Sequence, residues 1–89
     1  METNLKKKAI RRLKIAAGQI KGLERLVSED KYCIDVINQS FAIKNALSSF
    51  EDLMLENHLK THAMHQIQHG KSSQMAKEIL AVYKLSKKK

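Results

Sequence analysis

The residues most capable of chemistry in this 89-residue chain are one cysteine and four histidines. Cys33 is the only thiol, and His58 and His62 are spaced four apart, so on a helix both imidazoles lie on one face about a turn apart. A thiolate and two imidazoles supply three ligands suited to trigonal Cu(I), or to zinc with one open position. The pattern therefore indicates a metal site.

Other interpretations of these residues stay open. A free cysteine is often only a small buried hydrophobic residue, and histidines near a helix end are often solvated. Cys33 falls in the first turn of a predicted helix, where unpaired N–H groups and the macrodipole favour a thiolate that binds soft metals or reacts with electrophiles. His65 and His69 continue the cluster, and we expect them in solvent because they fall into a predicted loop.

One long helix from Asp30 to His65 is expected to carry the three donors, with apolar residues on more than one face, as at the centre of a bundle. If it is unbroken, Cys33 and His58 lie roughly 37 Å apart, whereas a metal–ligand bond is only ~2.0–2.3 Å long. Two antiparallel copies can close the site, which predicts a dimer with metal at its interface. A break at Ser48 and Ser49 would instead let one chain close it.

Two further helices are expected. The first begins near Leu5 and ends at Ser28-Glu29-Asp30, with Asp30 capping the second helix. A loop from Gln66 to Lys71, hinged at Gly70, precedes a third helix capped by Ser72 or Ser73. The first helix is predicted to pack through an apolar seam with spacings of four and three, formed by Leu5, Ala9, Leu13, Ala16, Ile20, Leu23 and Val27.

Composition favours one all-α domain over residues 1–89, with a basic tail at 86–89. The chain is 43% hydrophobic, has no Trp or Pro and has three Gly, which is typical of aliphatic helix bundles, and so small a core favours an oligomer. A single cysteine suits the reducing cytoplasm, and the chain has no apolar stretch for a membrane span or signal peptide. No phosphate loop, carboxylate pair or nucleophile set indicates an enzyme.

The net charge of +8 makes polyanions the expected partners. Lys and Arg crowd the predicted first helix, which suits the phosphate backbone of double-stranded DNA, although an acidic membrane surface is a rival. The near absence of aromatic residues argues against single-stranded nucleic acid.

Two segments, RRLKIAAGQIKGLERLVSEDKYCIDVINQSFAIKNAL and LENHLKTH, resemble the CsoR/RcnR family of metal-sensing transcriptional repressors. The resemblance runs from about Lys8 to Tyr83. It implies a three-helix subunit that pairs into an antiparallel dimeric four-helix bundle, with dimers assembling as a homotetramer (a dimer of dimers). It also implies that the apo-protein binds operator DNA and is released when metal binds between subunits.

The resemblance also implies roles for individual residues. Cys33 and His58 match two copper ligands, and His62 stands where copper-sensing members have a second Cys. Tyr32 and Glu78 occupy positions that couple metal to DNA. Arg12 and Lys44 match two basic positions that the family uses on its DNA-binding face. Three neighbouring basic residues could join them: Lys8, Arg11 and Lys14.

This ligand set favours Cu(I), with nickel, cobalt and zinc as alternatives within the family. The nickel/cobalt branch adds a His near the N-terminus, and residues 1–8 contain none. A formaldehyde-sensing branch relies on an N-terminal Pro, which this chain lacks. Two hypotheses outside metal sensing remain: a repressor that senses electrophiles or persulfide through Cys33, and an architectural DNA-binding protein indifferent to ligands.

Overall fold

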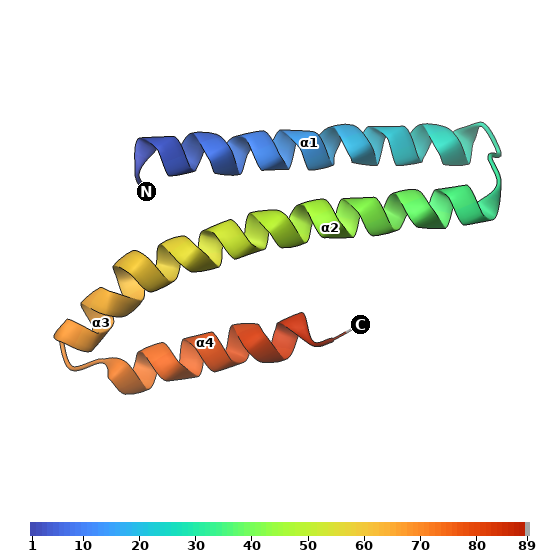
Figure 1. Ribbon diagram of the computed structural model, residues 1–89. Coiled ribbons are helices and arrows are strands. Elements are labelled where there is room, and N and C mark those ends of the chain that lie inside the picture. The colour runs from blue at the N-terminus through green and yellow to red at the C-terminus, as the bar shows by residue number, and fades with distance from the viewer. Residues whose placement is uncertain (89) are drawn as a thin grey trace. The chain divides into compact units, whose positions relative to one another are not determined.

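The computed structural model describes residues 1–88, which form helices joined by short turns (Figure 1). The all-α prediction is confirmed, and these residues contain no strand. No loop separates α2, η1 and α3, so three long helical segments result. The helices are α1 (Thr3–Ser28), α2 (Cys33–His58), the π-helix η1 (Leu59–Ala63), α3 (Met64–Gln68) and α4 (Ser72–Ser86).

The chain forms two compact units, Met1–Leu55 and the remainder from Glu56. The single domain expected over residues 1–89 stays a prediction. The expected basic tail at 86–89 overlaps α4 at Ser86 and ends at Lys89, which lies outside the described residues. Among the described helices, none combines the length and apolarity that a bilayer crossing requires.

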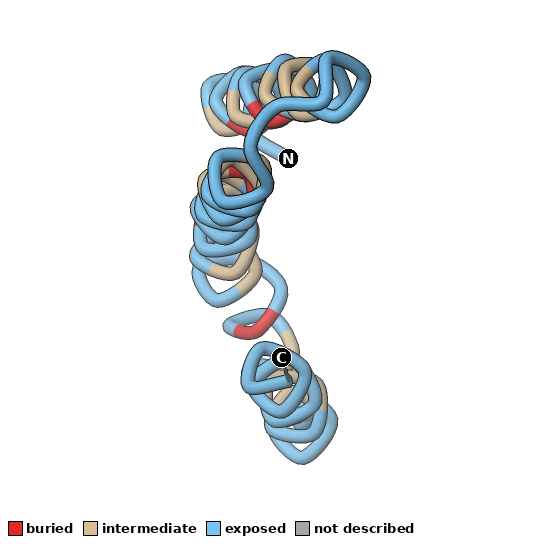
Figure 2. The backbone as a smooth tube through the Cα atoms, turned by 90° about the vertical axis from the view of Figure 1, so that its right-hand side faces the viewer, coloured by how far each residue is buried: buried red, intermediate tan, exposed pale blue. Residues whose placement is uncertain are grey.

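In the first unit, α1 and the N-terminal part of α2 run antiparallel side by side (Figure 1). Ala9 and Ala16 of α1 are only 5% and 3% exposed, and Ile43 of α2 is 7% exposed. Figure 2 shows the buried stretches of α1 on the side that faces α2. Because two of these three buried side chains are alanines, the apolar contact between the two helices is narrow.

The predicted seam of α1 is only partly correct. Leu13, Ile20 and Val27 remain 41%, 48% and 58% exposed. Arg12 and Gln19 instead stand in the row that faces α2, the inward row. Arg12 forms a hydrogen bond to α2 through its side chain, and Gln19 through its backbone carbonyl. The half-buried or buried members of this row, again spaced four and three, are Leu5, Ala9, Arg12, Ala16, Gln19 and Leu23.

Two hydrogen bonds join the inward row to α2. Arg12 Nη1 donates to the carbonyl oxygen of Ser49 at 2.7 Å, and Gln39 Nε2 donates to the carbonyl oxygen of Gln19 at 3.4 Å. The bond from Arg12 replaces a bond to water and so lets this polar side chain occupy a half-buried position, whereas Oε1 of Gln19 is buried without a hydrogen-bond partner within residues 1–88. The exposed row of Leu13, Ile20 and Val27 is thereby left uncovered by this chain.

The turn after α1 corrects the predicted role of Asp30. Asp30 does not cap α2: its φ is 55°, in the left-handed region that Asn, Asp and Gly tolerate best. Its N–H donates to Val27 O at 3.1 Å and the N–H of Lys31 donates to Leu26 O at 2.9 Å, which is the Schellman pattern that closes a helix. Asp30 therefore ends α1, and α2 begins three residues later at Cys33.

The loop predicted over Gln66 to Lys71 is shorter than expected, because the helix continues through α3 to Gln68. Gly70 is the hinge, as predicted, with φ of 73°. The N–H of Lys71 donates to Gln66 O at 2.7 Å, so this turn has the same helix-closing pattern. Ser72 is the first residue of α4 and does not cap it with its side chain.

Candidate metal centre

A π-helical turn positions the histidine pair. His58 is the last residue of α2, and His62 lies in η1. Backbone bonds of a π-helix run from i to i+5, and such turns are frequent at functional sites. Thr61 Oγ1 donates to the carbonyl oxygen of Asn57 at 2.7 Å within this turn. The imidazoles of His58 and His62 stack with their centroids 5.5 Å apart and their planes 5° from parallel.

Glu78 of α4 lies beside this pair. Its Oε2 is 3.7 Å from Nε2 of His58, and it accepts hydrogen bonds from the amide nitrogens of Gln74 and Gln66 at 3.0 and 3.3 Å. The pKa of Glu78 lies below its usual 4.5. The hydrogen bond from Gln74 lowers it most, followed by the bond from Gln66 and by the nearby charges of His58 and His62, whereas desolvation raises it. Glu78 is therefore an ionised acceptor at neutral pH.

These groups line one open hollow of the second unit. Its lining comes from η1, α3, α4 and the end of α2, and comprises His58, Thr61, His62, His65, Gln66 and Glu78. His65 is exposed, as expected, but it lies on α3 and not in a loop, and it lines the hollow. Oε1 of Gln66 is buried there without a hydrogen-bond partner within residues 1–88.

The other predicted donor, Cys33, lies in the first unit as the first residue of α2, where it is exposed. The N–H groups of Asp35 and Val36 donate to the carbonyl oxygen of Tyr32, whose side chain is exposed, at 3.0 and 3.2 Å. No break occurs at the predicted alternative, Ser48-Ser49. Within residues 1–88, no three His, Cys, Asp or Glu side chains of this single chain form a group that could hold a metal.

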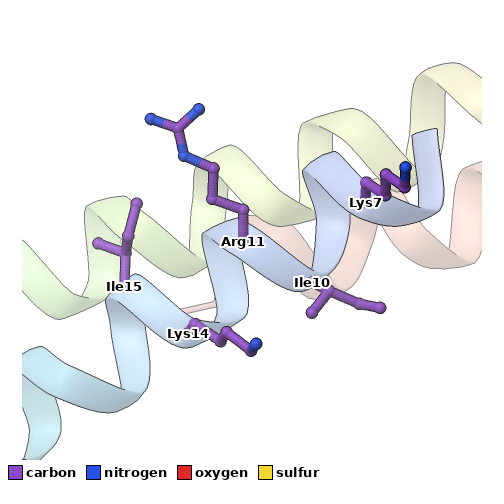
Figure 3. A pocket seen from close by; sticks show the side chains of 5 residues that line it. All are labelled: Lys7, Ile10, Arg11, Lys14 and Ile15. Atoms are coloured by element: carbon purple, nitrogen blue, oxygen red, sulfur yellow. The ribbon is translucent and has the colours of Figure 1, made fainter. Parts of the chain in front are cut away.

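The predicted DNA-binding residues do not share one face. Arg11 and Lys14 stand on α1 with α2 behind it (Figure 3), whereas Arg12 is in the inward row. Lys8 is exposed, and Nζ of Lys44 on α2 lies 5.5 Å from the ring centroid of Phe41. The shallow depression that contains Arg11 and Lys14 is lined by Lys7, Ile10, Arg11, Lys14 and Ile15.

Three other basic residues of α1 were not among the predicted DNA-binding residues. Lys7, Lys21 and Arg25 share a face with Arg11 and Lys14, because the five fall at spacings of four, three, seven and four. This stripe, the outer basic row, stands opposite the inward row on a helix of 3.6 residues per turn. The periodicity of the sequence alone could have identified it.

The chain combines a helical architecture with an imidazole pair beside a carboxylate and with an outer basic row. These features are those of helical proteins that respond to a metal and bind a polyanion. The family model of the metal-sensitive transcriptional repressors matches residues 5–84, and the chain belongs to that family. Its members are transcriptional repressors and not enzymes.

Individual relatives carry copper in their names. The chain is 35% identical over 86 residues to the copper-sensing transcriptional repressor RicR of Mycobacterium tuberculosis, covering 93% of this chain and 90% of the relative. It is 32% identical over 84 residues to CsoR of Mycobacterium ulcerans, covering 94% and 72%. The crystal structure of the copper-sensing repressor CsoR with Cu(I) from Geobacillus thermodenitrificans superposes with a TM-score of 0.90 at 30% identity, covering 99% and 92%.

Proposed function

We propose that this chain is a copper-responsive transcriptional repressor. The metal-free oligomer, a homotetramer built from antiparallel dimers, binds double-stranded operator DNA and is released when Cu(I) binds between subunits. Cys33 of one subunit and His58 and His62 of the partner subunit form the site.

The continuity of α2 is the observation that carries this proposal. Cys33 is its first residue and His58 its last, and the helix has 26 residues. At ~1.5 Å per residue the donors stand roughly 37 Å apart, so one α2 cannot hold both on one ion. Two antiparallel copies place each Cys33 beside the histidines of the other helix, which makes the dimer a requirement for the site.

The donor set fits Cu(I). The exposed thiol of Cys33 and the stacked imidazoles of His58 and His62 are soft to borderline ligands. When bound, Cu(I) supplies the bonds that join Cys33 to the histidines across the subunit boundary. Nickel and cobalt would require more nitrogen or oxygen donors, and zinc would leave one position open; competition with a chelator of known affinity for each ion separates these alternatives.

Glu78 and Tyr32 are proposed to connect the site to the rest of the subunit. Nε2 of His58 is the ring nitrogen that faces Glu78, which leaves Nδ1 for the metal. An ionised Glu78 can accept the Nε2–H bond and so fix the tautomer and orientation of the ring. Tyr32, next to Cys33, is a second candidate partner for this ring. Such bonds couple metal to DNA only if they differ between the two states of the oligomer.

Cys33→Ala tests the metal-sensing proposal. We expect the variant to bind operator DNA like the parent and to lose release by Cu(I), because the thiolate is the only sulfur ligand. Fluorescence anisotropy of labelled operator DNA during a Cu(I) titration measures both properties, with Ser48→Ala on the same helix as the control. A folded Cys33→Ala protein that no longer binds DNA would contradict the proposal.

The outer basic row is the surface that we propose for DNA. Arg11 and Lys14 project there with Lys7, Lys21 and Arg25, on the side of α1 away from α2. Cationic side chains along one helix face neutralise successive phosphates and release counterions. Lys8, Arg12 and Lys44 stay predictions for this surface, and Arg12 already donates to the backbone of α2.

A double variant tests the outer basic row. Arg11→Ala with Lys14→Ala should weaken DNA binding and reduce the slope of log K against log salt by about 2 for each subunit whose outer basic row contacts DNA, roughly 1 for each phosphate that is no longer neutralised. Lys84→Ala with Lys88→Ala removes the same charge from the end of α4 and beyond it, so its slope should stay near that of the parent. Equal slopes for both double variants would remove the outer basic row from the DNA surface.

A reactive-thiol sensor is the second candidate function. The exposure of Cys33 at the first residue of α2 favours it, because an exposed thiol is accessible to electrophiles. In that case electrophiles or persulfide would modify Cys33, and the histidines would only tune it. Mass spectrometry after electrophile exposure, paired with DNA-release assays, distinguishes this function from metal sensing.

A further inference from the structure

All four histidines of the chain lie in the second unit, within a short stretch of sequence. Their spacings of four, three and four put them along one side of a helical segment. The proposed copper site uses His58 and His62. His65 and His69, which follow on α3 and at its end, have no role in that site.

The geometry of this second pair is close. His69 is the C-cap of α3, and its N–H donates to the carbonyl oxygen of His65 at 3.1 Å, so one backbone turn fixes the two residues relative to each other. Their ring centroids are 4.1 Å apart and their planes are tilted by 36°. Both residues are exposed, so a metal replaces only water at their nitrogens.

We propose that His65 and His69 form a second metal site, which takes a divalent transition cation of borderline softness. Two neutral imidazoles one turn apart provide adjacent nitrogen ligands, and water completes the coordination. Imidazole without thiolate suits Ni²⁺, Cu²⁺ and Zn²⁺ and lacks the sulfur that favours Cu(I). Glu78, which lines the same hollow as His65, places a negative charge near the site in an otherwise basic chain.

The site is independent of the copper site in its ligands. It needs one chain only, whereas the Cys33 site needs two subunits. A cation held there would clamp the last turn of α3 just before the Gly70 hinge, and binding to the folded state alone stabilises that state. The binding of a cation to this second site can therefore be measured without DNA and without copper.

Ni²⁺ is the probe for the test. The full chain carrying Cys33→Ser, His58→Gln and His62→Gln should bind one Ni²⁺ per chain in calorimetry, and paramagnetic Ni²⁺ should broaden the imidazole NMR signals of His65 and His69. Adding His69→Gln should weaken this binding at least tenfold. Unchanged Ni²⁺ affinity after His69→Gln, or no binding by the triple variant with its helical circular dichroism intact, would overturn the proposal.

The reciprocal variant keeps the test decisive if the triple variant fails to fold. His69→Gln in the otherwise unchanged chain should lose one Ni²⁺ equivalent relative to the parent. Its release from operator DNA by Cu(I) should be unchanged. The same Ni²⁺ stoichiometry as the parent would overturn the second site. A failure of Cu(I) to release the parent protein from operator DNA would instead contradict only the proposed function.

Discussion

The contact between Glu78 and His58 is the point at which a bound metal could affect the rest of the subunit. The carboxylate lies 3.7 Å from Nε2 of His58 and is held by two glutamine amides. Those amide bonds lower its pKa and keep it ionised as an acceptor. Gln66 belongs to α3 and Gln74 to α4. Movement of the His58 ring would therefore displace Glu78 and, through its hydrogen bonds to these amides, act on both helices.

Glu78→Gln should separate metal binding from DNA release. Glutamine keeps the shape but is a weaker acceptor for the Nε2–H of His58, so we expect Cu(I) affinity to fall by about 10- to 100-fold at most and Cu(I)-driven release to weaken by about fivefold or more. Chelator competition and operator anisotropy measure the two effects.

Glu24→Gln on α1 is the control for Glu78→Gln, because it changes the net charge by the same amount away from the hollow. If both variants release DNA at the same copper concentration as the parent, Glu78 has no coupling role.

At the scale of elements, the π-turn of η1 decides how the histidines face the hollow. A π-turn holds one more residue than an α-turn, so it changes the direction of every side chain that follows. In this chain the extra residue falls between His58 and His62, and the hydroxyl of Thr61 bonds the carbonyl oxygen of Asn57. The stacked imidazoles belong to this turn, because His58 directly precedes it and His62 lies within it.

Deletion of Thr61 should convert η1 to ordinary α-helix. Helical circular dichroism should be preserved, because i to i+4 bonds replace the π bonds, while His58 and His62 become three residues apart and lose their stacking. We expect Cu(I) affinity to fall by about tenfold or more, about 1.4 kcal/mol, measured by chelator competition. Thr61→Val keeps the length and removes only the hydroxyl; an equal loss in that variant would attribute the effect to the hydroxyl and not to the spacing.

At the scale of the whole molecule, apolar side chains left exposed by one chain are the basis for an oligomer. Leu13, Ile20 and Val27 recur every seven residues along α1 and are 41–58% exposed. On α2, Ile37 and Phe41 are 45% and 53% exposed. Contiguous exposed apolar side chains often mark protein–protein interfaces, and the proposed dimer would bury this row.

Ile20→Glu should dissociate the oligomer, because a carboxylate in a buried interface without a partner costs several kcal/mol. Sedimentation should show a smaller species, with loss of high-affinity Cu(I) binding, since the proposed copper site needs two subunits. Ile15→Glu is the matched control: Ile15 is 49% exposed against 48% for Ile20 but lies beside Arg11 and Lys14. Dissociation by both variants, or by neither, would exclude the row of Leu13, Ile20 and Val27 as the interface.

The donor roles of Cys33, His58 and His62 stay predictions, whereas the sequence by itself determined the helical class, the bounds of the long helices to within a few residues and the hinge at Gly70. These properties depend on residue type and on local periodicity, which a linear sequence contains. The resemblance extended this information to Glu78, which the structure places beside His58.

Only the tertiary structure decided which of two neighbouring rows of α1 turns toward α2, and it chose the row with Arg12 and Gln19 over the exposed row of Leu13 and Ile20. It also decided that Asp30 closes α1 and that a π-turn separates His58 from His62. The row that turns inward is joined to α2 by bonds between residues 37 and 20 positions apart in the sequence. Packing against other parts of the chain, which has no signature in local periodicity, makes that choice.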